Sequence, residues 1–174
     1  VEITDDADPK IVIKRISRGD QDAVKNNELT DSFTMRLNPL VVDIPTALSP
    51  INEEVIPECV TLRAADFSSP TPSALHGQSH WQVSTTSDDF LQPVAESWKN
   101  FENWYFEEDT QLGDDLTDEE ILGLDENSTY WWRVRYRDRE LNWSEWTIPV
   151  SFITGASIAS PNLLINPGAE DSLA

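Results

Sequence analysis

Carboxylates are the most abundant groups in this sequence that could do chemistry. Ten Asp or Glu residues fall between Glu107 and Glu126, while no Lys or Arg occurs between Asn100 and Trp132. Carboxylate oxygens at this density could bind calcium, which takes roughly six to eight oxygen ligands. The acids do not follow the Asp-x-Asp-x-Asp-Gly order of an EF-hand loop, so a solvated acidic loop is the alternative. A second acidic stretch opens the chain, and the candidate metal ligands from both stretches are Asp5, Asp6, Asp8, Asp114, Asp115 and Asp118.

The motifs of catalytic nucleophiles and phosphate-binding loops do not occur in the sequence. It has no Gly-x-Ser-x-Gly elbow, no Cys-x-x-Cys pair and no His-Glu-x-x-His. A glycosidase would need two carboxylates at a fixed separation, and the many acids specify no such pair. The one cysteine, Cys59, belongs to an apolar alternation and is expected to be buried. The two histidines, His76 and His80, stand in a stretch rich in Ser, Pro and Gly that predicts a turn. We therefore expect no catalytic residues and no required cofactor.

The charge of the chain argues against two classes of partner. Its formal net charge is −20, with 12 Lys and Arg against 32 Asp and Glu. Binding to nucleic acid or to an anionic membrane needs clustered basic residues, so we expect neither as a partner. No run of about 18 apolar residues occurs, so we also expect no membrane insertion. The 174 residues are enough for one domain with flanking segments, and 11 prolines against 6 glycines favour many short elements.

Short runs of alternating apolar and polar residues recur about every ten positions in the middle of the chain. The predicted strands are Val60–Ala64, Trp81–Ser84, Val94–Trp98, Trp104–Phe106, Glu120–Leu122, Tyr130–Tyr136 and Val150–Ile153. In the longest of them, every second residue from Tyr130 faces the core, and the arginines between face outward. The pattern predicts an all-β sandwich or barrel.

The chain divides into three parts by composition. Residues 1–42 contain two alternating patterns, around Ile11 and Phe33, and are expected to form an extra N-terminal β segment. Two strands are not stable alone, so this segment is expected to pack on its neighbour or to be a fragment of an upstream, Calx-beta-like module. Residues 43–155 form the main domain. Residues 156–174 are expected to be a linker followed by the start of a truncated downstream module.

One segment of the main domain resembles the late strand of fibronectin type III domains. Leu124 precedes Tyr130 by six residues, as in that family, although Glu126-Asn127 replaces the usual Pro-Gly. The resemblance extends from about Thr46 to Gly155 and is especially close to bacterial extracellular versions. It implies an immunoglobulin-like β-sandwich in which Leu124 and Tyr130 form a tyrosine corner.

The segment Trp143-Ser-Glu-Trp146-Thr147 resembles the Trp-Ser-x-Trp-Ser element of cytokine-receptor fibronectin domains, with Thr147 in place of the last serine. In that family the tryptophans stack between arginines of the neighbouring strand. The resemblance therefore implies a structural ladder, held by cation–π contacts, of Trp143, Trp146, Arg133, Arg135 and Arg137. The alternative is that exposed aromatic rings stack on sugars, and the further candidates for this are Trp98, Trp104 and Tyr105.

The two ends of the chain resemble parts of other modules. Val1–Asp8 is similar to the last strand of a Calx-beta repeat, whose aspartates bind calcium. Asn162–Glu170 is similar to the start of galactose-binding-like carbohydrate modules. Both resemblances imply a multidomain parent protein.

We therefore expect a non-catalytic extracellular binding or spacer module of a larger secreted or cell-surface protein. The alternative is an accessory domain, for carbohydrate binding or positioning, of a secreted hydrolase. The expected partners are the neighbouring domains of the parent protein, and polysaccharide or another surface protein.

Overall fold

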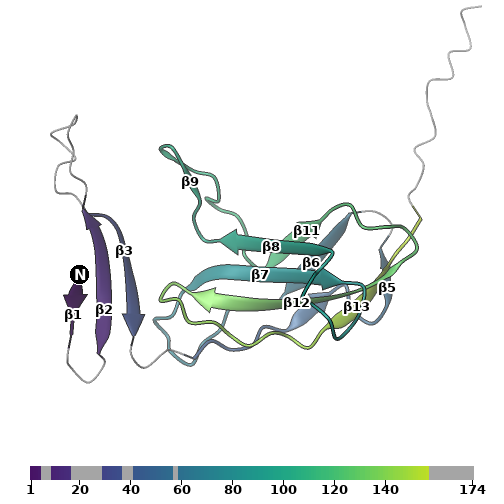
Figure 1. The fold of residues 1–174 in the computed structure, drawn as a ribbon, viewed down its shortest axis with the longest axis horizontal. Helices are drawn as coiled ribbons and strands as arrows, with labels where there is room; N and C mark the ends of the chain where they lie inside the picture. The colour runs from purple at the N-terminus through teal and green to yellow at the C-terminus, as the bar shows by residue number, and fades with distance from the viewer. Residues whose placement is uncertain (5–8, 17–28, 37–40, 57–58, 157–174) are drawn as a thin grey trace, which may run out of the picture.

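The computed structural model describes residues 1–4, 9–16, 29–36, 41–56 and 59–156. All regular elements within these residues are β-strands (Figure 1). Most of the strands form two sheets that enclose a common core, and three others form a separate sheet near the N-terminus. The described residues contain no helix that is long and apolar enough to cross a bilayer.

The larger sheet of the sandwich has five strands. They are β5 (Glu54–Ile56), β7 (His76–Ser84), β8 (Ala95–Asn100), β12 (Thr129–Asp138) and β13 (Val150–Thr154). Their order in space is β5-β13-β12-β7-β8. Strand β12 pairs antiparallel with both β13 and β7, while β5 pairs parallel with β13.

The facing sheet has three strands. A small separate hairpin follows β8 in the sequence and precedes the last strand of the facing sheet. The strands are β4 (Ala47–Ser49), β6 (Val60–Ala64) and β11 (Asp118–Ile121), and the hairpin is β9 (Trp104–Tyr105) with β10 (Glu108–Asp109). The order β11-β6-β4 is antiparallel throughout. Two sheets with this strand order form an immunoglobulin-like, fibronectin type III-like β-sandwich, as predicted.

The core lies between the sheets because alternate residues of each strand point inward. Trp132 of β12 is fully buried and stacks on Trp81 of β7, with ring centroids 5.8 Å apart. Leu62 of the facing sheet is also fully buried in the same cluster. The indole Nε1 of Trp132 donates a hydrogen bond to the carbonyl of Pro50 at 2.8 Å, so its one polar group is satisfied.

Tyr130 lies at the start of β12, where the chain enters the strand. Its hydroxyl accepts a hydrogen bond from the backbone N–H of Asp125 at 3.0 Å, and Leu124 packs against the core. Asn127 has a φ of 51°, a left-handed conformation that Asn adopts more readily than most residues. The Glu126-Asn127 pair can therefore form a turn at this position without a glycine.

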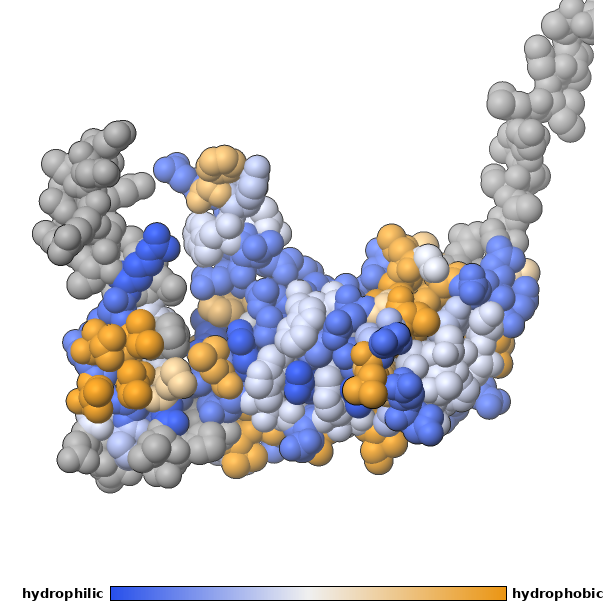
Figure 2. All heavy atoms as spheres, viewed as in Figure 1, coloured by the Kyte–Doolittle hydropathy of each residue, from blue (hydrophilic) through white to orange (hydrophobic). Residues whose placement is uncertain are grey.

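The N-terminal sheet consists of β1 (Glu2–Ile3), β2 (Lys10–Ile16) and β3 (Leu29–Arg36). Its register pairs Ile3 with Ile11 and Ile11 with Met35, so these three side chains share one face. All three are exposed, and Figure 2 shows an apolar area over this sheet. Arg36 at the end of β3 joins the sheet to the sandwich through a two-point ion pair with Glu140.

Several sequence predictions can be compared with these strands. The strand at Val60–Ala64 is confirmed to the residue, whereas the one predicted at Glu120–Leu122 begins earlier and ends at Ile121. The predicted turn around His76 and His80 was wrong, because both residues belong to β7. The prediction that Cys59 is buried was also wrong. The residue is exposed because it precedes the first inward-facing position of β6. Asp5, Asp6, Asp8 and the segment 162–170 lie outside the described residues.

Candidate functional site

The outward face of the five-stranded sheet carries the residues with functional potential. Because neighbouring strands pair in register, their side chains form three rows across β12, β7 and β8. The rows are Arg133–Gln82–Glu96, Arg135–His80–Trp98 and Arg137–Gln78–Asn100. Each position in them holds a polar or aromatic side chain, so this face can form a network of hydrogen bonds and ring contacts.

A turn at the end of β12 leads the chain back over this face. Asp138 is fully buried, and its carboxylate accepts hydrogen bonds from the backbone N–H groups of Glu140 at 2.8 Å and Asn142 at 2.9 Å. It also accepts one from the side-chain amide of Asn142 at 2.7 Å. Leu141 has a φ of 71° within this turn. The carboxylate therefore holds the reversal that places the following segment beside β12.

Ser144 and Thr147 attach the returning segment to β12. The hydroxyl of Ser144 accepts a hydrogen bond from the backbone N–H of Tyr136 at 3.0 Å, and its own N–H donates to the Tyr136 carbonyl at 2.8 Å. Thr147 makes the equivalent pair with Val134, at 3.1 and 2.9 Å. The two hydroxyls thus supply acceptors that a neighbouring strand would otherwise provide. Thr147 therefore performs the same task toward Val134 as Ser144 performs toward Tyr136.

The attached segment brings two tryptophans among the arginines of β12. The guanidinium carbon of Arg135 lies 4.4 Å from the ring centroid of Trp143 and 4.5 Å from that of Trp146. Arg133 lies 4.1 Å from the Trp146 centroid, and Arg137 lies 5.5 Å from the Trp143 centroid. Each indole therefore contacts two guanidinium groups. We call these five residues the ladder.

His80 connects the ladder to β8. Its side chain is only 3% exposed, and Arg135 donates hydrogen bonds from Nε and Nη2 to His80 Nδ1, at 3.3 and 3.2 Å. A guanidinium can only donate, so Nδ1 is an acceptor and the proton sits on Nε2. Nε2 in turn donates to Oε1 of Glu96 at 2.7 Å. Both ring nitrogens are therefore engaged.

The surroundings keep His80 neutral. Burial lowers the pKa of its imidazole, and the neighbouring guanidinium of Arg135 lowers it too, while the hydrogen bond to Glu96 acts in the opposite direction. The net shift is downward from the ordinary histidine value. A neutral imidazole with both nitrogens bonded within the protein is poorly placed to take a proton from a substrate.

Trp98 extends the stack from His80 toward solvent. The two rings lie 3.4 Å apart at their centroids with 19° between their planes, and Trp143 meets Trp98 edge-on at 5.8 Å. Trp98 is nevertheless 48% exposed. Because His80 covers one face of the indole, the accessible area belongs chiefly to the opposite face.

Trp104 and Tyr105 occupy a different part of the molecule. Both lie in the hairpin β9–β10, which projects from the sandwich in Figure 1, and both are exposed. The indole Nε1 of Trp104 donates to Glu102 at 3.1 Å. Of the three aromatic residues predicted as ligand contacts, Trp98 is the one stacked on the sheet face.

The acidic loop surrounds a lysine. Nζ of Lys99 lies 3.2 Å from Asp114, 3.4 Å from Asp118 and 3.8 Å from Glu119. Burial alone would lower the pKa of Lys99, but the carboxylates outweigh it and the pKa is raised. Asp115 instead accepts hydrogen bonds from the N–H and hydroxyl of Thr117, at 2.8 and 2.7 Å. Within the described residues, no group of three or more His, Cys, Asp or Glu side chains is arranged to share a metal ion.

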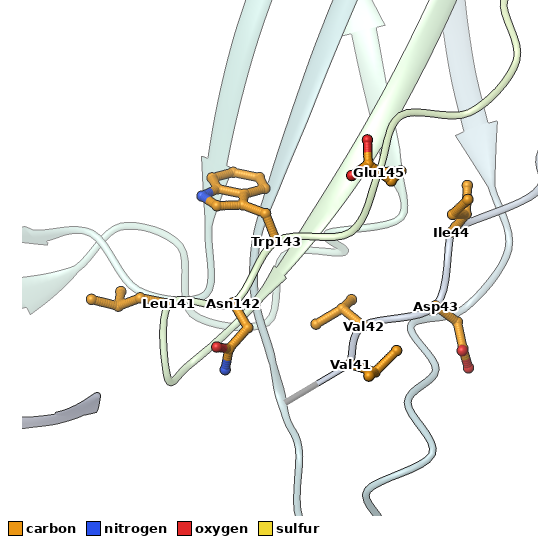
Figure 3. Close-up of a pocket in the computed structure, with 8 residues that line it drawn as sticks. All are labelled: Val41, Val42, Asp43, Ile44, Leu141, Asn142, Trp143 and Glu145. Carbon is orange, nitrogen blue, oxygen red and sulfur yellow. The ribbon is translucent and has the colours of Figure 1, made fainter. Parts of the chain in front are cut away.

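An open cleft of about 650 Å³ lies between the segment that enters the sandwich and the turn after β12 (Figure 3). Val41, Val42 and Ile44 line one side, and Leu141, Trp143 and Glu145 line the other. Trp143 thus contributes both to the ladder and to the cleft.

Sequence reasoning missed His80 and Asp138 as parts of this site. The signal for His80 was present, because the alternation of Trp81 and Val83 extends back through Ser79 and places His80 outward, opposite the arginines of β12. The role of Asp138 depends on the geometry of one turn, for which the sequence offered no separate pattern.

No protein-family model and no curated protein matches the sequence. Among solved structures, an α-L-rhamnosidase of Streptomyces avermitilis complexed with L-rhamnose shares 20% identity over 67% of this chain, with a TM-score of 0.48. This chain spans 11% of the rhamnosidase. The sixth fibronectin type III domain of human fibronectin type III domain containing protein 3 shares 14% identity. That match covers 69% of this chain and 89% of the domain, with a TM-score of 0.36.

A chain of a cytokine receptor complex shares 21% identity, over 77% of this chain and 63% of that chain, with a TM-score of 0.38. At such identities a likeness concerns the fold alone. The fold itself is the fibronectin type III-like sandwich that the strand order defines.

Proposed function

We propose that this chain is a non-catalytic module that holds neighbouring parts of a larger extracellular protein at a fixed spacing. The observation that carries the proposal is the ion pair between Arg36 and Glu140, which are 104 residues apart in sequence. Both nitrogens of the guanidinium edge donate to the carboxylate, and the Nη2–Oε1 distance is 2.9 Å. A bidentate pair fixes relative orientation as well as distance.

The course of the chain supports a position in series between two neighbours. In Figure 1 the N-terminal sheet lies at one end of the long axis, and β13 leads out of the sandwich toward the other end. The ladder and its hydrogen bonds stiffen the sheet between these ends. A module with this course can hold the domains at its two ends at a fixed distance from each other.

The N-terminal sheet supports the view that the parent protein continues beyond the sandwich. Its exposed apolar face, which includes Ile3, Ile11 and Met35, is of the kind that another element usually covers. We propose that residues 1–42 belong to the end of an upstream module, residues 43–155 to the sandwich domain, and residues 156–174 to a linker and the start of a downstream module. The neighbouring domains are then the first partners.

A secreted or cell-surface location and the lack of catalysis belong to the same proposal. A net charge of −20 opposes binding to nucleic acid. The one described histidine–carboxylate pair on the sheet face, His80 with Glu96, has its ring nitrogens bonded within the fold. We therefore expect no turnover of glycosides or phosphate esters by the purified chain.

The spacing role is tested by reversing the charge of Arg36 and measuring small-angle X-ray scattering. Arg36→Glu should release the N-terminal sheet from the sandwich and broaden the distribution of interatomic distances, because two carboxylates would then face each other. Adding Glu140→Arg to that variant should recover the original distribution. Lys14→Glu, which breaks the exposed Lys14–Glu2 pair inside the N-terminal sheet, is the matched control and should leave the profile unchanged. Identical scattering from Arg36→Glu and the unmutated chain would refute the spacing role.

A second candidate function is an accessory carbohydrate-binding or positioning domain of a secreted hydrolase. The specific observation in its favour is the open face of Trp98 on an otherwise polar sheet surface. This candidate is compatible with the spacing role, because the two use different surfaces.

A further inference from the structure

Trp98 is a rigid, flat aromatic surface with one side open to solvent. Its inner face rests on His80, and the imidazole is itself fixed by Arg135 on one nitrogen and by Glu96 on the other. An exposed aromatic side chain normally loses rotamer freedom when a ligand orders it, and this loss weakens binding. Here the fold has already ordered the ring.

Hydrogen-bonding groups stand on both sides of this ring along β8. Glu96 and Asn100 are two positions away in either direction, and side chains at such positions share a face of the strand about 7 Å from one another. The open indole face is therefore bordered by a carboxylate and an amide at a distance comparable to the width of one pyranose ring.

Both flanking groups are oriented by their neighbours. Oε1 of Glu96 accepts hydrogen bonds from His80 and, at 2.8 Å, from Gln82 Nε2. The side chain remains 41% exposed, which leaves its second oxygen able to accept from a ligand. Oδ1 of Asn100 accepts from Gln78 Nε2, which directs the donor side of that amide elsewhere. The site thus offers one acceptor and one donor on opposite sides of a flat apolar surface.

From this juxtaposition we propose that Trp98, Glu96 and Asn100 form a binding site for a neutral polysaccharide. A sugar ring presents C–H groups on its flat face and hydroxyls around its rim, so its face can rest on Trp98 while the rim reaches Glu96 and Asn100. This inference deepens the second candidate function, and it concerns Trp98 rather than the tryptophans of the ladder. A glycan rich in uronate or sulfate fits less well, because Glu96 borders the ring and the chain carries −20.

The test is an NMR titration of the indole N–H signals with soluble neutral hexasaccharides of glucose, xylose and mannose, up to about 10 mM. At least one of these sugars should shift the indole N–H signal of Trp98. That signal is assigned as the one missing from the spectrum of Trp98→Ala. Affinity for that sugar should fall at least about tenfold in Trp98→Ala, because the substitution removes the flat surface on which the sugar ring rests. Asn100→Ser, which leaves the ladder untouched, should weaken binding several-fold. Trp104→Ala removes another exposed tryptophan and should bind as the unmutated chain does.

Several results would overturn the site. The first is that no hexasaccharide shifts the Trp98 signal. The second is that the unmutated chain and Trp98→Ala bind equally well. The third is that the chain binds only polygalacturonate and that sodium chloride abolishes this binding. Saturation by a proline-rich peptide with no response to sugars would instead show a protein-binding surface. None of these results would alter the scattering profile of Arg36→Glu, so a failure of the sugar site is distinguishable from a failure of the spacing role.

Discussion

Arg135 makes contacts of two kinds, and both depend on the shape of its side chain. It lies against two indoles through its guanidinium, and it donates two hydrogen bonds to the buried Nδ1 of His80. A planar, forked cation can do both at once, whereas the compact ammonium of lysine cannot. The residue therefore couples the ladder to the stack that carries Trp98.

We expect Arg135→Ala to lower the free energy of unfolding by about 0.5–2 kcal/mol, through lost cation–π contact and lost alkyl packing. Urea unfolding followed by tryptophan emission measures the change, and the emission of the folded state should itself shift as indole faces meet water. Arg135→Lys should recover little of the loss. An unchanged unfolding midpoint and slope in Arg135→Ala would mean that the ladder adds nothing to stability.

His76 makes the fold sensitive to mild acid. Its ring stacks on Phe67, with centroids 5.0 Å apart, and lies 4.3 Å from that of Tyr136. Burial lowers the pKa of His76 to about 4, although a hydrogen bond that the imidazole donates to the backbone of Gln78 and the charge of Asp115 act in the other direction. Below the unfolded value of about 6.5 the unfolded chain therefore binds a proton that the folded chain refuses.

Stability should thus be complete above about pH 6.5 and should fall as the pH is lowered toward about 4. At about pH 5 the loss from His76 should reach at most about 2 kcal/mol, and His80, whose pKa is also lowered, adds to it. His76→Phe keeps the aromatic stacking and removes the titration. Urea unfolding of both proteins at about pH 7 and about pH 5 compares the losses. Equal losses would show that His76 is not the source.

At the scale of elements, the segment after β12 behaves as a partial strand. It makes one isolated bridge, between Arg137 and Trp143. Its further attachments to β12 pair the backbone N–H and the hydroxyl of Ser144 with Tyr136, and those of Thr147 with Val134. Side-chain acceptors can replace a strand only where the spacing of hydroxyls matches that of the free N–H groups. The sequence Trp-Ser-Glu-Trp-Thr meets this condition.

Thr147→Val is therefore expected to cost about 1–3 kcal/mol, because it leaves the buried N–H of Val134 without its acceptor. Thr147→Ser keeps the hydroxyl and should cost much less. Thermal or urea unfolding of the two variants measures the difference. If the serine variant is as unstable as the valine variant, the hydroxyl is not the stabilising group and the methyl packing is.

The sandwich was predictable from sequence because apolar, inward-facing residues alternate clearly with polar ones along its strands, as in β6 and β12. The first half of β7 was not, because Gly77 in a polar stretch is typical of a turn. The structure gives another reason for that glycine, since a Cβ there would lie 2.7 Å from the carbonyl oxygen of Asp138. Trp98 could be named as a candidate, but its stacking on His80 required the register of three strands. Local alternation predicts which face a residue takes and does not predict what covers that face.

At the scale of the whole molecule, the net charge of −20 is unevenly countered. Four of the 12 basic residues lie within residues 133–139, where the ladder arginines occupy the sheet face. Lys99 of β8 contacts the acidic loop through Asp114, Asp118 and Glu119. Repulsion among the remaining acids should therefore oppose folding at low ionic strength.

We expect sodium chloride to raise the melting temperature by screening this repulsion, over the range in which the Debye length shrinks from about 30 to 10 Å.

Calcium chloride at matched ionic strength should raise the melting temperature no further in the unmutated chain, because Lys99 already lies among the loop carboxylates. Lys99→Met removes that cation. In this variant calcium should give an additional rise, since an ion that binds only the folded state stabilises it by RT ln(1 + [L]/Kd), where [L] is the free calcium concentration. An extra rise with calcium in the unmutated chain would instead indicate a specific calcium site outside the acidic loop. Asp5, Asp6 and Asp8 would then be the first residues to replace in locating it. Equal responses to both salts in both proteins would show that the loop acids bind no calcium, with or without the lysine.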